Sequence, residues 1–415
     1  MSNIYTIISL ALTGAVLIAY LNHRYIRLQP TIAIMLASLG LSLGLVVLGQ
    51  LGYNNLQTQA AAILAKLDFN HLLMNGMLSF LLFAGALNVD INQLKNRKWE
   101  VFTLATVGTL ASTLLIGVLS YYLLNALGIK IDFIYCLLFG ALISPTDPIA
   151  VLAMCKEVKV PRQLETSIAG ESLFNDGIGI VLFLTIFQVA FTHQSASIGS
   201  ISLLFLQEAG GGILYGLGLG LVGYWLIKSI DDPKLEILIT LAMATGGYAL
   251  AQAIGVSGPL AMVVAGILIG NHGKRFSMSV ASQRNLDNFW ELIDEVLNTL
   301  LFFLIGLELL VIKISSQDLL ACAIAIPLVL LVRFITVAGP LSIFKLKTTY
   351  APHSIKILTW GGLRGGLAVA LALALPVGPY RNLILAMTYA VVIFSIAVQG
   401  TSIKPLIRLS KEQAE

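Results

Sequence analysis

Long apolar windows separated by short polar connections run along almost the whole chain. Windows of roughly 17 to 25 residues are long enough to cross a bilayer as helices. The pattern predicts an all-α membrane protein with thirteen transmembrane helices, at approximately 4–22, 31–51, 70–89, 101–127, 131–154, 166–192, 205–228, 235–254, 256–270, 287–312, 318–343, 354–375 and 381–403. The more polar stretch between residues 51 and 70 is predicted to be a loop.

The composition supports this interpretation and excludes an ordinary soluble domain. Of the 415 residues, 57% are hydrophobic and only 11% are charged, whereas a soluble domain is about one-quarter charged. The three cysteines lie in or beside apolar windows without the spacing of metal ligands, and no two histidines share a helix face. We therefore expect no cofactor, no resident metal and no nucleic-acid partner.

The basic residues are unevenly divided between the connections. Those after odd-numbered helices, together with the C-terminal tail, carry 19 of the 25 Lys and Arg residues, and the other connections carry 4. Because Lys and Arg concentrate on the cytoplasmic side, we expect the N-terminus outside and the C-terminus in the cytoplasm. The short chain, without a soluble regulatory domain, indicates a multi-pass protein of a bacterial inner membrane.

Two of the predicted helices are interrupted. The fifth breaks at residues 144–148 (SPTDP), because each proline lacks a backbone donor and disfavours helix in the residue before it. The twelfth breaks at residues 360–367 (WGGLRGGL), where four glycines surround Arg364. Broken backbone at membrane depth must be buried in protein or line a cavity, so Asp147 and Thr146 become candidate ion ligands. The alternative is a kinked structural helix with Asp147 as a buried cap.

A weak internal echo relates the two halves of the chain. Residues 81–87 (LLFAGAL) end the third window and residues 302–308 (FFLIGLE) end the tenth, an offset of 221 residues. The same offset carries Asp147 to position 368, beside the glycines of the twelfth window. Windows seven apart run in opposite directions, so the echo predicts two inverted repeats with an interrupted helix in each, which is the pattern of a transport site.

The sixth window begins with the stretch GESLFNDG at residues 170–177, where Glu171 and Ser172 lie one helical turn before Asn175 and Asp176. Burial of an unpaired carboxylate favours its neutral form, so Asp176 could hold either a proton or a small cation, but not both. With Ser172 as a further oxygen ligand, that competition is sufficient for antiport. The alternative is a purely structural Asn-Asp pair.

Two arginines lie inside the predicted membrane region, and a buried arginine needs a partner. For Arg364 the candidates are Glu171 and Asp147, and we expect the ion pair with Glu171. Arg333 is left to extend toward the membrane surface or to pair with Glu308.

Three acids, Glu291, Asp294 and Glu295, begin the tenth window on its predicted cytoplasmic side. They either line an access funnel that attracts cations or belong to a solvated helix end.

Taken together, these motifs resemble one known family. The stretches at residues 144–148 (SPTDP), 170–177 (GESLFNDG), 362–366 (GLRGG), 289–291 (FWE) and 304–308 (LIGLE) are similar to motifs of the monovalent cation/proton antiporters of the NhaP/NHE branch. The resemblance covers essentially the whole membrane domain.

The resemblance implies an antiporter fold of the NhaA type, in which the two interrupted helices cross, and a homodimer. It divides the single domain (1–415) into a dimerisation and scaffold part, about 4–95 and 235–315, and a mobile core part, about 101–192 and 318–403. It also implies specific roles within the core: Na⁺ at Asp176, Ser172 and Thr146; Asp147 balancing the helix ends; Asn175 forming or gating the site; and Glu171 paired with Arg364. One departure from the family pattern is Ala84, where some relatives carry an acid.

These features predict a secondary transporter that exchanges Na⁺, and also Li⁺, for H⁺ by alternating access. Since Asn175 is neutral, one shared charge predicts electroneutral 1:1 exchange. The alternatives are a potassium/proton antiporter or a sodium-coupled carrier of an organic solute. An enzyme is not expected, because Ser172 has no histidine partner near it in the sequence.

Overall fold

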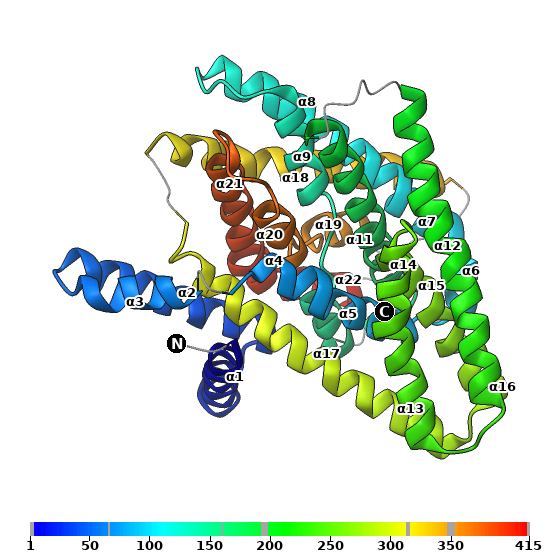
Figure 1. Ribbon diagram of the computed structural model, residues 1–415. Coiled ribbons are helices and arrows are strands. Elements are labelled where there is room, and N and C mark those ends of the chain that lie inside the picture. Colours follow the sequence, from blue (N-terminus) through cyan, green and yellow to red (C-terminus); the bar gives the residue numbers. More distant parts are fainter. Residues whose placement is uncertain are drawn as a thin grey trace.

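The computed structural model describes residues 4–64, 67–158, 160, 162–191, 198–312, 316–346 and 353–412. Within these ranges every regular element is a helix, which confirms the all-α prediction (Figure 1). Nine helices of this part are long and apolar enough to cross a membrane. Of the other four predicted windows, two are interrupted, α15 is short, and α17 carries too many charges in its first half.

The first half of the described chain contains α1 (Ile4–Leu21), α2 (Pro30–Gln50), α3 (Asn54–Leu64), α4 (Phe69–His71), α5 (Leu78–Leu87), α6 (Ile91–Asn96), α7 (Lys98–Phe102), α8 (Thr109–Ala126), α9 (Phe133–Ile143), α10 (Ile149–Val158) and α11 (Arg162–Phe191). Wide π-helical turns follow α1, α4 and α7, at Asn22–Ile26, Leu72–Met77 and Thr103–Gly108. Helix α3 corrects the loop predicted between residues 51 and 70: its polar residues are compatible with a helix that lies outside the main bundle, at the left of Figure 1.

The second half contains α12 (Ile198–Lys228), α13 (Pro233–Ala242), α14 (Tyr248–Ala253), α15 (Gly258–Leu268), α16 (Lys274–Ser277), α17 (Val280–Glu308), α18 (Ser316–Phe344), α19 (Ser354–Trp360), α20 (Gly366–Leu373), α21 (Arg381–Phe394) and α22 (Thr401–Glu412). Here π-helical turns follow α13, α15 and α21, at Met243–Gly247, Ile269–Gly273 and Ser395–Gly400.

The two interrupted helices cross at their breaks. The pair α9 and α10 is separated by the proline-containing segment, and the pair α19 and α20 by the glycine-rich segment. An antiparallel bridge joins the breaks, with the Asp147 N–H donating to the Leu363 carbonyl at 2.8 Å. The approach requires glycine: a Cβ atom on Gly365 would overlap the Asp147 carboxylate, and one on Gly362 would lie 2.6 Å from Arg333 Nε.

The helices pack in two sets. In the first, α17 contacts α1, α2, α5 and α13, while α15 contacts α5 and α12. In the second, α9 contacts α8, α11 and α20, while α18 contacts α8, α19 and α21. Contacts of α11 with α12 and α15, and of α17 with α20, join the sets. Helix α11 therefore belongs to the second set and also faces the first.

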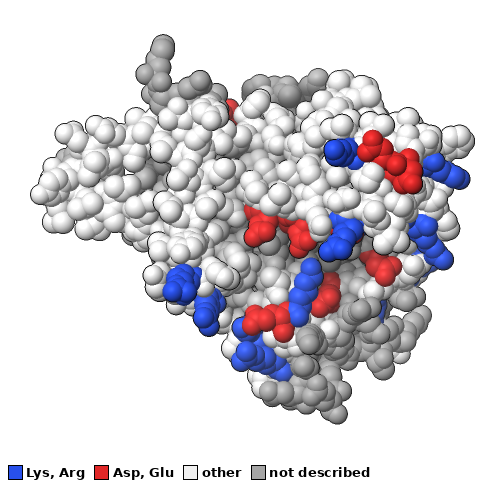
Figure 2. Space-filling view, turned by 90° about the horizontal axis from the view of Figure 1, so that it is seen from below, with Lys and Arg blue, Asp and Glu red and all other residues white. Residues whose placement is uncertain are grey.

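Charged side chains gather on one face of the molecule. Figure 2 shows this face from below, with acidic and basic side chains over its centre and right, while the left side is almost uncharged. Such a segregation is expected of a protein whose apolar flanks lie in lipid and whose charged face meets water.

Candidate functional site

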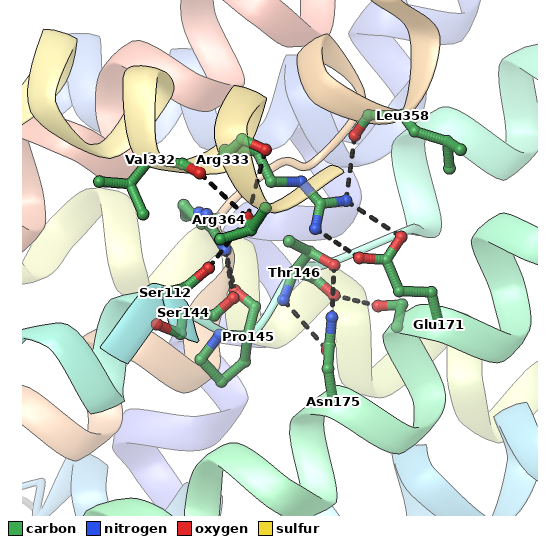
Figure 3. Close-up of polar contacts among 12 residues, drawn as sticks. Ser112, Ser144, Pro145, Thr146, Glu171, Asn175, Val332, Arg333, Leu358 and Arg364 are labelled. Carbon is green, nitrogen blue, oxygen red and sulfur yellow. Dashed lines mark hydrogen bonds and ion pairs between the residues drawn. The ribbon is translucent and has the colours of Figure 1, made fainter. Parts of the chain in front are cut away.

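The polar stretch of α11 lies against the crossing of the interrupted helices (Figure 3). The Asn175 side chain contacts Thr146 twice: its Oδ1 accepts from the Thr146 N–H at 3.2 Å and its Nδ2 donates to the Thr146 hydroxyl at 2.9 Å. The Ser172 hydroxyl donates to the Thr146 carbonyl. All three residues are buried, so α11 satisfies the backbone that the break leaves without helical partners.

Arg364 stabilises the C-terminal end of α9. Its guanidinium donates to the carbonyl oxygens of Ser144 and Pro145, the latter at 2.8 Å, and its backbone N–H donates to the Ser395 hydroxyl at 2.9 Å. Carbonyls at a helix C-terminus carry partial negative charge. The arginine therefore compensates the electrostatics of a helix end that lacks its next turn.

The predicted ion pair between Glu171 and Arg364 is wrong. Glu171 forms a two-pronged ion pair with Arg333 of α18, in which Nη2 lies 3.0 Å from Oε2, and Arg333 also donates to the Leu358 carbonyl at 3.0 Å. Both alternatives offered for Arg333, extension toward the membrane surface and pairing with Glu308, are wrong for the same reason. Because α18 packs against α19, it brings Arg333 to Glu171 at the crossing, while helix-end carbonyls occupy Arg364.

Asp147 lies at the N-terminal end of α10, where its Oδ1 accepts from the Ile149 N–H at 3.0 Å. A carboxylate at this position balances the partial positive charge of a helix N-terminus. The structure therefore places opposite charges at the two sides of the break, with Arg364 at the end of α9 and Asp147 at the start of α10.

Asp176 differs from its neighbours on α11. It makes no hydrogen bond or salt bridge with any described residue, and it retains accessible surface, whereas Glu171 and Asn175 are only 2% and 1% exposed. Asp147 and Arg364 lie within electrostatic range of Asp176 and have opposite effects on it: the Asp147 carboxylate disfavours its negative charge and the Arg364 guanidinium favours it. Asp176 is therefore an acid beside the broken helices whose oxygens remain available for a ligand.

One acid of α17 approaches this group. Asp294 is partly buried, interacts with the Asn298 side chain, and lies within electrostatic range of Asp147. Glu291 and Glu295 are exposed on the same helix. Asp294 is therefore the acid of this group that lies within electrostatic range of the crossing, and an access funnel formed by the three acids stays a prediction.

Two further positions complete the description. Ala84 of α5 is 1% exposed and belongs to a buried apolar cluster with Phe83 and Trp290, so this part of α5 offers no side-chain ligand. Ser395, which binds the Arg364 backbone, was not identified from the sequence. A single serine in an apolar window carries no signal of its partner, which lies 31 residues away in the chain.

Comparison with known proteins gives a consistent result. Residues 11–409 match the family described as the transmembrane sodium/hydrogen exchanger. The chain is 48% identical over 396 residues to the Na(+)/H(+) antiporter NhaP of Pseudomonas aeruginosa, covering 94% of this chain and 93% of that protein. It is 37% identical over 344 residues to the Na(+)/H(+) antiporter NhaH of Halobacillus dabanensis, covering 82% and 83%.

The fold also has a solved counterpart. The sodium proton antiporter MjNhaP1 of Methanocaldococcus jannaschii superimposes with a TM-score of 0.76 over 96% of both chains, at 20% sequence identity. With the family match spanning nearly the full length, the chain belongs to the sodium/hydrogen exchanger family.

Proposed function

We propose that this protein exchanges Na⁺ for H⁺ across a membrane, with Asp176 as the group that binds the two ions in turn. The observation that carries the proposal is that Asp176 is unpaired and accessible beside two interrupted helices whose own charges are already compensated. Its relatives are named sodium/proton antiporters. The same names do not favour exchange of potassium or uptake of an organic solute.

The chemistry follows from competition for one carboxylate. A proton on Asp176 removes the negative charge that would hold Na⁺, and bound Na⁺ excludes the proton. Ser172 and the Thr146 region supply further oxygen ligands for the cation, while Asn175 holds the break between α9 and α10 in place. Because one negative charge is neutralised by either ion, each turnover exchanges one Na⁺ for one H⁺ and moves no net charge. Li⁺ is accepted on the same oxygen ligands.

We further propose how the chain is arranged in its membrane. Thirteen helices form two inverted repeats, the N-terminus lies outside, and the charged face of Figure 2 lies in the cytoplasm of a bacterial cell. Residues of about 4–95 and 235–315 form the scaffold of a homodimer, and residues of about 101–192 and 318–403 form the moving core. The packing of the described helices in two sets supports this division.

Exchange by purified protein in vesicles tests the assignment of Asp176. With a pH gradient imposed and reported by a fluorescent dye, added Na⁺ should dissipate the gradient for the wild type. Asp176→Asn should abolish the response, because an amide neither titrates nor attracts a cation. Asp132→Asn is the matched control, since Asp132 is exposed at the start of α9, and it should exchange normally. Full activity of Asp176→Asn would refute the assignment.

A further inference from the structure

An apolar cavity of about 390 Å³ lies on a different side of α11 from the contacts with Thr146. Its walls come from α6, α11, α12 and α15, and include Phe174, Leu217 and Leu221. The only polar groups among its lining residues are those of Tyr224 and His272. A volume of this size is typical of a ligand site, and its lining suits a hydrocarbon rather than an ion.

The wall formed by α12 is open to the surroundings of the protein. Leu217 and Leu221 are 42% and 51% exposed, and α12 is one of the helices long and apolar enough to span a membrane. Exposed leucines on such a helix meet acyl chains. The cavity is therefore accessible from the hydrocarbon region.

Basic side chains lie at one end of the cavity. Lys228 ends α12 one turn after Tyr224, with its Nζ 5.7 Å from the centre of that ring, and Arg275 follows His272 by three residues. Neither Lys228 nor Arg275 forms a salt bridge with a described acid, whereas the neighbouring Lys274 pairs with Asp287. Lys228 ends α12, His272 lies in the π-helical turn after α15, and Arg275 lies in α16; α12 contacts both of these segments. These three residues are called the basic rim.

We propose that an anionic phospholipid binds here, with an acyl chain in the cavity and its phosphate on the basic rim. Burial of the chain removes apolar surface from the cavity wall, and uncompensated basic groups attract a phosphate. The orientation proposed above places the rim in the cytoplasmic leaflet, where anionic lipids and polybasic segments meet. The lipid site depends on that orientation but not on the ion that the protein exchanges.

The bound lipid acts on the transport helix. Phe174 of the cavity wall directly precedes Asn175, which binds Thr146 at the break between α9 and α10. The opposite walls of the cavity come from α12 and α15, which belong to the other helix set. A ligand that contacts both sets stabilises the arrangement in which the cavity exists. Anionic lipid should therefore raise thermal stability and change the rate of exchange.

Two pairs of variants test the site. Leu221→Trp fills the cavity, and Leu226→Trp is its control, since Leu226 is equally exposed on the same helix, at 50%, but does not line the cavity. Lys228→Ala with Arg275→Ala removes the lysine and the arginine of the rim. Lys234→Ala is the control, since it removes an exposed lysine of the next helix. Native mass spectrometry measures phosphatidylglycerol and phosphatidylcholine retained on each protein, and thermal unfolding measures stabilisation by added phosphatidylglycerol.

The wild type and both controls should retain phosphatidylglycerol in preference to phosphatidylcholine and unfold at a higher temperature with it. The rim variant should lose about thirtyfold in retention, the scale of two basic contacts at a membrane surface. The cavity variant should also lose retention, because the tryptophan occupies the space of the acyl chain. Equal retention of both lipids by the wild type, or unchanged retention by Leu221→Trp, would overturn the proposal. So would a change of oligomeric mass in Leu221→Trp without loss of lipid, because a second copy would then cover the cavity. None of these readouts requires transport.

Discussion

Two arginines lie near the crossing of the interrupted helices, and each compensates a different kind of charge. Arg333 neutralises the carboxylate of Glu171, while Arg364 binds the carbonyls of Ser144 and Pro145. Asp176 is left without a direct partner, which is the property that an exchange site needs. The sequence indicated that the buried arginines need partners, but it could not assign those partners, because three of the four acceptor groups are the backbone carbonyls of Ser144, Pro145 and Leu358.

The ion pair between Glu171 and Arg333 should be structural. Glu171→Gln or Arg333→Met leaves the other charge buried, so each is expected to destabilise the protein by about 3–5 kcal/mol. The double variant should lose less than the sum of the single losses, as thermal unfolding in detergent would measure. Glu157→Gln is the control: its pair with Lys404, at 2.6 Å, is largely exposed and should contribute less than about 1 kcal/mol. Additive losses for Glu171 and Arg333 would contradict the assignment.

At the scale of elements, the local sequence predicted the two broken helices, whereas their crossing was expected only from the family resemblance. Proline and clustered glycine mark a break wherever they occur in an apolar window, so residues 144–148 and 360–367 carried a local signal. The bond between Asp147 and Leu363 has no local signal. Helix α3 was missed because a polar stretch outside the bundle is compatible with a helix as well as with a loop. Four predicted spans do not appear as single long apolar helices, because two are interrupted, one is short and one carries several charged residues.

The crossing should be intolerant of any side chain at Gly365. A Cβ atom there would overlap the Asp147 carboxylate, so Gly365→Ala must displace either Asp147 or the segment between α19 and α20. We expect exchange to fall about a hundredfold, the scale of an angstrom-sized misplacement at a site. Gly218→Ala in α12 is the matched control, since nothing lies within 4 Å of its added atom. Normal exchange by Gly365→Ala would show that the close approach is unnecessary.

At the scale of the whole molecule, the proposed ion site lies in one helix set and faces the other. Helix α11 carries Asp176 and contacts α12 and α15, while Asp294 approaches from α17. Relative movement of the sets would therefore change the access to Asp176 without changing its neighbours within the second set. The apolar windows predicted which segments enter the membrane, but how they group depends on contacts between distant parts of the chain.

Electroneutral exchange is a prediction at this scale. Since Asn175 is neutral and its amide binds Thr146, we expect the second set to carry a single exchanging carboxylate. Protein on a solid-supported membrane should give no steady current when Na⁺ is added, and exchange in vesicles should not respond to membrane voltage. Asp176→Asn provides the background for both measurements. A sustained Na⁺-driven current in the wild type would require a second exchanging charge.

The contacts at the crossing also limit how such a protein can move. Arg364 and Ser144, which are 220 residues apart in the chain, touch directly, and the Asp147 amide is held by Leu363. If one break moved alone, the Arg364 guanidinium would lose its carbonyl acceptors and the Leu363 carbonyl would lose its donor, and burial of the crossing keeps water from replacing these partners. The α9–α10 pair and the α19–α20 pair are consequently expected to move as one rigid unit, so that a ligand or mutation that immobilises one pair immobilises both.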